Sequence, residues 1–351
     1  MTKTRILVVD DSALVRRLVS DLLSAEPGLD VIGTAPNGRI ALAKIRQARP
    51  DVVTLDVEMP EMDGLATLKE LRRAYPLLPV IMLSSLTERG AAATLDSLLL
   101  GATDYVTKPS GPSATQALKD ELVAKIRAVV PGESSPPPAP VRRDVAAFRD
   151  SSAVPEVVVV GASTGGPNAL TELLTGLGGI PVPILVVQHM PPLFTRMLAE
   201  RLAAKTGLQV REAVDGETAQ AGVVHVAPGD FHLEVADART PGRIRLHQGP
   251  AENSCRPSVD VLFRSAAKAC RSAVLGVMLT GMGQDGLRGA REVREAGGRI
   301  LAQDEATSVV WGMPGAVARA GLADEVLPPA LLRQEVLRRT ARMPRQGAGR
   351  G

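Results

Sequence analysis

Runs of apolar residues alternate with amphipathic stretches along the first 130 residues of the chain. The amphipathic stretches, such as 13–26 and 64–75, repeat their apolar residues every three or four positions, which predicts helices. Short continuous apolar runs of the kind that form buried strands stand between them, at residues 5–10, 29–35, 51–56, 78–83 and 103–108. Strands that alternate with helices predict a parallel sheet with helices on both faces.

The same alternation returns after a break. Residues 131–154 are rich in proline and serine and have no sustained apolar period, which predicts an extended linker. Beyond it, residues 208–248 predict shorter strands joined by turns, and further apolar runs occupy 156–162, 183–189, 273–280 and 299–303. The pattern therefore predicts an α/β protein with domains at 1–130 and 155–340 and a flexible tail at 341–351.

The composition narrows the class of protein. The 351 residues are 45% hydrophobic and carry a net charge of +3 with dispersed arginines, which argues against nucleic acid binding. No apolar stretch approaches the roughly 20 residues that span a bilayer, so we do not expect the chain to insert into membranes. We expect the protein to be cytoplasmic and to be a monomer. The two cysteines, Cys255 and Cys270, lack metal-ligand spacing and are expected to be unpaired thiols, with Cys255 as a loop filler.

Polar side chains stand where the strands of the first domain end. Asp10 and Asp11 follow the first apolar run, Asp56 ends the third, and Lys108 ends the fifth. Alone, each aspartate could be an N-cap or turn residue. Together at one sheet edge, carboxylates would repel one another unless a hard cation such as Mg²⁺ neutralised them, and the lysine would stabilise phosphoryl charge.

The motifs VVDDS, LDVEMPEMDGL, MLSS and DYVTKPS, within residues 4–128, resemble the receiver domain of two-component response regulators. The resemblance implies a flavodoxin-like fold that accepts a phosphoryl group on Asp56 from a sensor histidine kinase. It assigns Mg²⁺ to Asp10, Asp11, Asp56 and the backbone of Glu58. It further implies that Lys108 contacts the phosphoryl oxygens, that Ser84 and Tyr105 form a switch pair, and that the bond before Pro109 is cis.

The stretch VVVVGASTGGPNAL at 157–170 is open to two interpretations. A dinucleotide turn requires G-x-G-x-x-G and an acidic residue about twenty positions later, but Ser163 replaces the second glycine, and Gln188 and His189 stand near that spacing. The same letters contain G-x-S-x-G, which places a nucleophilic serine on a strand-to-helix turn. We therefore favour Ser163 as a nucleophile over a phosphate-binding turn.

A serine nucleophile needs a general base and an orienting carboxylate at neighbouring strand ends. His189 ends an apolar strand, whereas the other histidines lie in the turn-rich region at His225, His232 and His247. Asp285 follows the strand at 273–280. The order Ser163, His189, Asp285 differs from the Ser, acid, His order of ordinary α/β-hydrolases.

The motifs GASTGGP, QHM, RPSVDVLFRSAA, LTGMGQDG and WGMPGA resemble the catalytic domain of chemotaxis protein-glutamate methylesterases, over about residues 155–340. The resemblance implies a doubly wound parallel-sheet hydrolase that needs no cofactor, activated by phosphorylation of the receiver domain. Its substrates would be methyl-accepting chemoreceptors, whose glutamate methyl esters it hydrolyses and whose glutamines it deamidates. Oxyanion and substrate contacts would come from Thr164, Gly165, Met282 and Arg256.

One departure and two rival functions stand beside this hypothesis. Ser254 and Cys255 precede RPSVD where the family more often has histidine and other basic residues. One rival is a phosphorylation-dependent binding module with an idle catalytic domain, although binding alone requires none of Ser163, His189 and Asp285. The other is the same chemistry in a chemosensory pathway that does not control motility.

Overall fold

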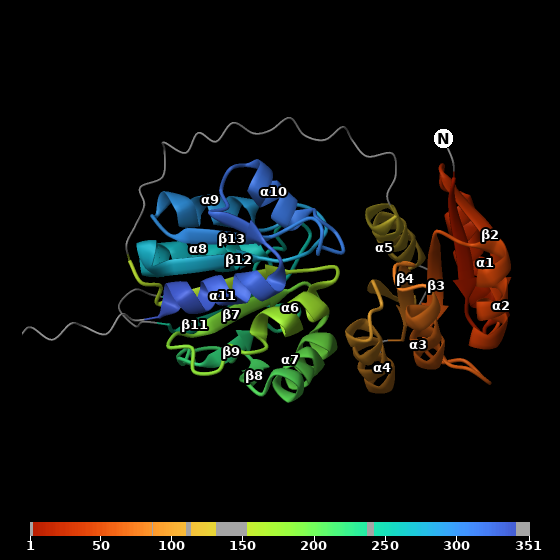
Figure 1. Ribbon diagram of the computed structural model, residues 1–351, viewed down its shortest axis with the longest axis horizontal. Helices are drawn as coiled ribbons and strands as arrows, with labels where there is room; N and C mark the ends of the chain where they lie inside the picture. The colour runs from red at the N-terminus through yellow and green to blue at the C-terminus, as the bar shows by residue number, and fades with distance from the viewer. Residues whose placement is uncertain (1–2, 86, 110–113, 131–152, 237–241, 342–351) are drawn as a thin grey trace, which may run out of the picture. The chain divides into compact units, whose positions relative to one another are not determined.

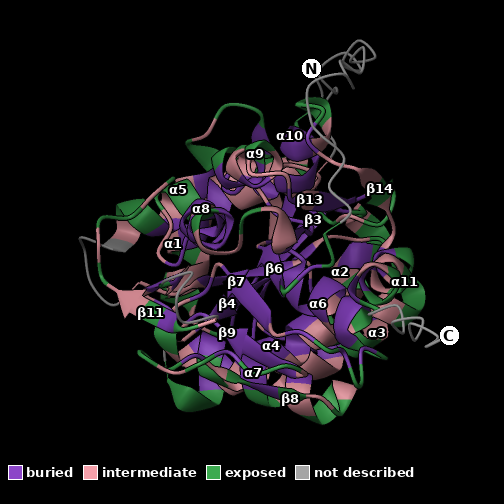
Figure 2. Ribbon diagram, turned by 90° about the vertical axis from the view of Figure 1, so that its left-hand side faces the viewer, coloured by how far each residue is buried: buried purple, intermediate pink, exposed green. Residues whose placement is uncertain are grey.

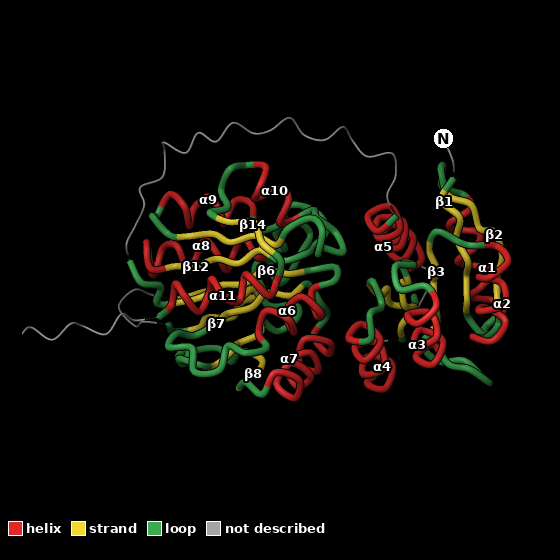
Figure 3. Tube along the Cα trace, viewed as in Figure 1, coloured by secondary structure: helices red, strands yellow, loops and turns green. Residues whose placement is uncertain are grey.

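The computed structural model describes residues 3–85, 87–109, 114–130, 153–236 and 242–341, which fall in two compact units, Met1–Pro138 and Ala139–Gly351. Each unit has its own parallel sheet flanked by helices (Figure 3). The predicted linker at 131–154, apart from its last two residues, and the predicted tail beyond residue 341 lie outside the described residues.

The first unit contains five parallel strands in the order β2-β1-β3-β4-β5 (Figure 1). The strands are β1 (Thr4–Val9), β2 (Leu29–Ala35), β3 (Val52–Asp56), β4 (Val80–Ser84) and β5 (Asp104–Thr107). The helices are α1 (Ala13–Ser24), α2 (Gly38–Ala48), α3 (Gly64–Ala74), α4 (Glu88–Leu99) and α5 (Ala114–Val129). This strand order is that of the flavodoxin-like fold, as predicted.

Polar residues start the helices of this unit. The side chains of Ser12, Asn37, Asp63 and Thr87 each accept a hydrogen bond from the first turn of the helix that follows. Such caps satisfy backbone donors that have no partner within the helix. They therefore fix where each strand-to-helix loop ends.

The second unit has a seven-stranded parallel sheet in the order β14-β13-β12-β6-β7-β9-β8 and an antiparallel hairpin, β10-β11. Its strands are β6 (Val157–Ala162), β7 (Ile184–Gln188), β8 (Gln209–Glu212), β9 (Val223–Val226), β10 (His232–Val235), β11 (Ile244–His247), β12 (Val274–Met278), β13 (Arg299–Gln303) and β14 (Glu325–Leu327). Its helices are α6 (Gly166–Leu174), α7 (Pro192–Thr206), α8 (Val259–Cys270), the short 3₁₀ helix η1 (Arg271–Ala273), α9 (Leu287–Glu295), α10 (Met313–Arg319) and α11 (Pro329–Thr340). The predicted doubly wound fold class is thus confirmed.

The valine run of β6 reflects burial on both faces of the sheet. Val157 and Val159 belong to a core cluster that includes Phe263 of α8 and Ala290 of α9. The alternate valines point to the other face and are also buried, at no more than 1% exposure. Figure 2 shows the sheet strands buried and the outer helix faces exposed. A strand covered on both sides is apolar throughout, which explains why the sequence shows a continuous run.

The chain reverses its direction of winding at β6. From β6 it proceeds to β7 on one side, and it later returns to β12 on the other. In open α/β sheets, such a switch point leaves a crevice at the carboxyl ends of the strands, where binding sites form. None of the helices in the described residues is long and apolar enough to span a membrane.

Candidate functional site

Ser163 lies on the tight turn between β6 and α6. Its carbonyl accepts hydrogen bonds from the Gly166 amide at 2.7 Å and from the Gln188 side chain at 2.9 Å. Gly165 adopts a φ of 78°, which favours glycine, and a Cβ at this position would lie 2.6 Å from a methyl group of Val309. The turn is therefore fixed by a close approach of loops, and Ser163 remains half-buried at its tip.

His189 follows β7 and pairs with Asp285, which follows β12. The His189 Nε2 and Asp285 Oδ2 atoms are 2.8 Å apart, and Asp285 is only 3% exposed. Because an ionised carboxylate can only accept hydrogen bonds, His189 must carry its proton on Nε2 when the ring is neutral. The lone pair that can accept a proton is then on Nδ1.

Asp285 is held from every side by donors at the start of α8. Its Oδ1 atom accepts from the Asn253 amide at 2.8 Å and the Ser258 hydroxyl at 2.7 Å. Its Oδ2 atom also accepts from the Val259 amide at 2.6 Å, and the Asp260 amide donates to Oδ1 at 3.2 Å. The carboxylate therefore caps α8 as well as orienting His189.

The two partners shift each other's pKa. Burial disfavours charge on both, but the hydrogen bond and attraction between them dominate. With the adjacent Cys255, they raise the pKa of His189 from 6.5 to about 9. Burial likewise opposes ionisation of Asp285, yet its donors lower its pKa from 3.8 to about 2. His189 and Asp285 therefore favour the charged pair, with a protonated imidazolium beside an ionised carboxylate.

The remaining nitrogen of His189 faces a thiol in this structure. Cys255 Sγ lies 3.7 Å from His189 Nδ1, and within the described residues the Ser163 hydroxyl has no hydrogen bond. Contacts of a nucleophile with its base are often long or absent before substrate binds. Ser163, His189 and Asp285 nevertheless follow β6, β7 and β12, which are adjacent in the sheet.

The GMG loop, residues 281–283, packs against the Ser163 turn. A Cβ on Gly281 would lie 2.8 Å from the Ser163 Cβ, so the two backbones are in direct contact. The Met282 amide that follows donates to no acceptor among the described residues. Thr164 is buried, and its carbonyl accepts from the Thr280 hydroxyl at 2.9 Å. A backbone donor beside the nucleophile is what an oxyanion site requires.

The predicted substrate contact Arg256 is engaged within its own loop. Its Nε atom donates to Asp230 Oδ1 at 2.9 Å, and its Nη1 atom donates to the Gly249 carbonyl at 3.0 Å. These bonds join the loop before α8 to the hairpin β10-β11. The structure therefore gives Arg256 a role in ordering that loop, and its role as a substrate contact stays a prediction.

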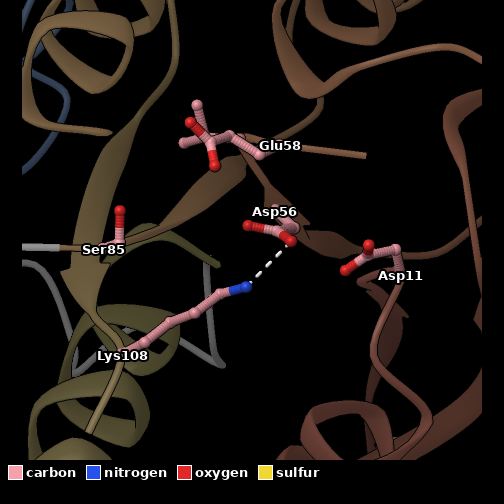
Figure 4. A pocket seen from close by; sticks show the side chains of 6 residues that line it. Asp11, Asp56, Glu58, Ser85 and Lys108 are labelled. Atoms are coloured by element: carbon pink, nitrogen blue, oxygen red, sulfur yellow. Dashed lines mark ion pairs between the residues drawn. The ribbon is translucent and has the colours of Figure 1, made fainter. Parts of the chain in front are cut away.

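The first unit gathers its predicted residues at the carboxyl edge of its sheet. Lys108 Nζ lies 2.8 Å from carboxylate oxygens of both Asp10 and Asp56. An open pocket of about 200 Å³ there is lined by Asp11, Asp56, Val57, Glu58, Ser85 and Lys108 (Figure 4). Asp10, Asp11 and Asp56 each offer an oxygen within 4.8 Å of the others. This set of hard oxygen donors fits Mg²⁺.

Burial raises the pKa of Asp56 from 3.8 to about 6; the neighbouring carboxylates Asp10 and Asp11 add to this shift, whereas Lys108 opposes it. A divalent cation among the three carboxylates would reverse the shift and favour the ionised side chain. Asp56 thus lines the pocket as a buried carboxylate, in an environment that a cation would complete.

The predicted switch residues, Ser84 and Tyr105, are not among the residues that line this pocket. The Thr94 hydroxyl of α4 donates to Ser84 Oγ at 2.6 Å, and the serine that lines the pocket is its neighbour, Ser85. Tyr105 is 6% exposed, and burial raises its pKa well above 10. The cis peptide bond found within the described residues precedes Pro257, so the expected cis bond before Pro109 is not present.

Sequence reasoning missed the residues that hold Asp285 and the Ser163 turn in place. Asn253 and Ser258 bond Asp285, and Gln188 bonds the Ser163 carbonyl. Cys255, expected to be a loop filler, lies beside His189. The unusual residues ahead of RPSVD were the available signal, because they stand in the loop that reaches the histidine.

Comparisons with known proteins agree with both halves of the chain. A family model described as CheB methylesterase matches residues 158–336, and one described as response regulator receiver domain matches residues 6–119. The solved CheB methylesterase catalytic domain of Thermotoga maritima is 43% identical, with a TM-score of 0.51, and covers 52% of this chain and 98% of its own.

Two relatives are similar over nearly their full length, and both are named protein-glutamate methylesterase/protein-glutamine glutaminase. The one from a Nocardioides species is 52% identical and covers 97% of each chain. The one from Trichodesmium erythraeum is 49% identical and covers 97% of this chain and 99% of its own. The chain therefore belongs to the protein-glutamate methylesterase/protein-glutamine glutaminase family, as a hydrolase with a receiver domain ahead of its CheB-type catalytic domain.

Proposed function

We propose that this enzyme hydrolyses glutamate γ-methyl esters and deamidates glutamines on methyl-accepting chemoreceptors, by a Ser163-His189-Asp285 mechanism that phosphorylation of Asp56 activates. The observation that carries the mechanism is the 2.8 Å contact between His189 and a buried, fully engaged Asp285 at the sheet edge that also presents Ser163. Ester hydrolysis and deamidation are both acyl transfers to water, so one set of residues serves both.

The chemistry proceeds in two halves. Ser163 Oγ attacks the side-chain carbonyl carbon while His189 Nδ1 takes its proton, and the same proton passes to the departing methanol or ammonia. Water then attacks the acyl-enzyme by the reverse sequence and frees the glutamate. Asp285 holds the proton on Nε2 throughout and stabilises the charged ring.

The oxyanion formed in each half needs donors beside Ser163. The Met282 amide, carried by a loop in contact with the Ser163 turn, meets that need, and the amides of Thr164 and Gly165 at the start of α6 are further candidates. Such preorganised donors stabilise charge that appears only in the transition state.

The receiver pocket supplies the control. A sensor histidine kinase would donate the phosphoryl group to Asp56, with Asp10, Asp11 and the backbone of Glu58 holding Mg²⁺. The bound cation would neutralise charge on the transferred group. Lys108, already 2.8 Å from Asp56, would contact the phosphoryl oxygens, and Ser84 and Tyr105 would respond to the new charge.

Substitution of the nucleophile tests the mechanism. Ser163→Ala should reduce methanol release from methylated receptor at least about a thousandfold, because only oxyanion and binding contributions would remain. Ser272→Ala is the matched control, since Ser272 precedes β12 at the opposite edge of the sheet. Equal rates in the two variants would exclude Ser163 as the nucleophile, and a wild-type chain that releases no methanol would favour a binding module.

A further inference from the structure

The proposed mechanism leaves one reactive group of the site unused. Cys255 stands on the loop before α8, is partly buried, and points its sulfur at His189 Nδ1 from 3.7 Å. Its other contact is with the Asn253 carbonyl at 3.4 Å. Since Nδ1 is the base in the proposed mechanism, the thiol lies at the lone pair on which the reaction depends.

The distance between these atoms matches a metal chelate. A tetrahedral Zn²⁺ bound to sulfur at about 2.3 Å and to an imidazole nitrogen at about 2.05 Å holds the two ligand atoms about 3.6 Å apart. The observed separation of 3.7 Å is close to this value. The ion would sit between them in the position that a hydrogen bond now occupies.

The second ring nitrogen of His189, Nε2, has the kind of partner that is usual for a metal-binding histidine. Metal-binding histidines usually donate their second ring N–H to a carboxylate, which fixes the tautomer and strengthens the ligand. Asp285 takes this part here, at 2.8 Å from Nε2, and its own donors keep it in place. His189, Cys255 and Asp285 together form a cluster whose potential ligand atoms lie within 4.8 Å of one another.

We propose that His189 Nδ1 and Cys255 Sγ form a binding site for a thiophilic divalent cation such as Zn²⁺, and that the bound ion inhibits the esterase. Binding displaces the thiol proton to solvent, and water completes the coordination. The ion occupies the lone pair that would take the Ser163 proton, so the acyl transfer stops. The inhibition rests on the proposed function, whereas the binding does not.

The ligand types separate this site from the receiver pocket. Nitrogen and thiolate ligands suit Zn²⁺ and Co²⁺, whereas Mg²⁺ prefers the oxygen ligands of Asp10, Asp11 and Asp56. The Mg²⁺ that serves the receiver domain would therefore leave the esterase free. A thiophilic ion would act at His189 without needing the receiver domain.

Cobalt binding to the full-length protein tests the site. Metal-free protein with Co²⁺ should develop the near-ultraviolet charge-transfer band of a cobalt–thiolate bond. Cys270→Ser should keep the band, because Cys270 lies at the end of α8, and Cys255→Ser and His189→Gln should lose or strongly weaken it. Ser163→Ala should also keep it, which separates this proposal from the catalytic one. No band in the wild-type protein, or an equal band in Cys255→Ser, overturns the proposal.

Activity provides the second measurement. Zn²⁺ at about ten times its dissociation constant should lower methanol release about tenfold, and a chelator should restore it. Cys255→Ser, compared with its own metal-free rate, should need a far higher Zn²⁺ concentration for the same loss. Zn²⁺ that binds with the cobalt signature but leaves methanol release unchanged would overturn the inhibitory role alone.

Discussion

Asp285 accepts hydrogen bonds on both of its oxygens and faces donors only. The donors to Oδ2 are His189 Nε2 and the Val259 amide, and the donors to Oδ1 are the Asn253 amide, the Ser258 hydroxyl and the Asp260 amide. An asparagine would turn its NH₂ group toward one of these two sets of donors. The sequence alone predicts that Asp285→Asn leaves stability unchanged, since asparagine caps helices about as well as aspartate, and that it lowers turnover if Asp285 orients His189. The observed set of partners gives a different expectation.

We therefore expect Asp285→Asn to lower both stability and turnover. Unpaired buried groups should reduce the free energy of unfolding by about 1–3 kcal/mol, and the wrong histidine tautomer should cut turnover by orders of magnitude. Asp260→Asn is the control, because Asp260 is equally buried, accepts from Asn253 and Gly289, and does not bond His189. Thermal melts and methanol release on both variants decide the matter: a stable, active Asp285→Asn would refute the triad.

The raised pKa of His189 predicts an alkaline rate profile. Only the neutral ring can accept the Ser163 proton, and its pKa is about 9, so methanol release should climb about tenfold per pH unit up to neutral pH and level off near pH 9. Rates measured between pH 6 and 10, corrected for chemical ester hydrolysis, test this. A plateau already reached at pH 7 would contradict it.

The His189–Asp285 pair should make the folded protein less stable as pH rises from neutral, over the same range in which the rate increases. His189 has a higher pKa when folded, so its contribution is complete below 6.5 and is lost as pH rises through about 9. Asp285 has a lower folded pKa, so its contribution holds above 3.8 and is lost as pH falls toward 2. The melting temperature should fall between pH 6.5 and 9 while the rate rises, and His189→Gln should flatten that fall.

The GMG loop (281–283) is closely packed beside Ser163. A Cβ on Gly281 would lie 2.4 Å from the Met313 sulfur and 2.8 Å from the Ser163 Cβ, so Gly281→Ala must move the loop or the serine. A displacement of about 1 Å can cost about a hundredfold in rate. Gly178→Ala has open space and is the control. Methanol release that stays normal in Gly281→Ala would remove Met282 from the oxyanion site.

The sequence predicted the five strands of the first sheet and β6, β7, β12 and β13 of the second to within a few residues, because strands buried on two faces must be apolar throughout. It placed β8 and β9 only within a turn-rich region at 208–248, and it did not predict the short edge strand β14. It also indicated that Ser163, His189 and Asp285 follow strands, and parallel strands bring such residues to one edge. It did not place Asn253, Ser258 and Cys255 at the site, because the path of a loop is set by contacts between distant segments.

A strand end shows the same limit at the scale of one residue. Ser84 is the last residue of β4 and contacts Thr94 of α4, whereas Ser85, just beyond the strand, lines the pocket. The sequence MLSS contains both candidates, and the structure puts Ser85 in the pocket wall. The prediction of Ser84 as a switch residue rests on its motif position in the resemblance to receiver domains, which does not show where its side chain points at rest.

For the whole molecule, joining a phosphorylation site to a hydrolase predicts conditional activity. A small-molecule phosphodonor with Mg²⁺ should raise methanol release by the full-length enzyme, and Asp56→Asn should abolish the rise, because the acceptor oxygen is gone. A shift of about 1.4 kcal/mol in the underlying equilibrium already changes a small active population about tenfold. Stimulation that persists in Asp56→Asn would place the effect elsewhere.

Removal of residues 1–130 distinguishes two forms of this control. If the receiver domain inhibits the esterase, the truncated enzyme should be faster than the unphosphorylated full-length chain. If phosphorylation instead promotes receptor binding, the truncated enzyme should be no faster. The second unit has its own hydrophobic core, so its folding without the first can be checked by circular dichroism.

Asp285 both orients His189 and caps α8, and these two roles affect how the enzyme could lose its activity during evolution. Under the proposed mechanism, loss of Ser163 would abolish hydrolysis and leave the fold intact, whereas loss of Asp285 would also remove hydrogen bonds that hold the start of α8. Descendants that keep the domain only for binding should therefore lose Ser163 first. They should retain Asp285 long after catalysis is gone. In a lineage of such pseudoenzymes, an aspartate preserved at this position would show that the fold still needs it to stabilise α8. It would not show that activity remains.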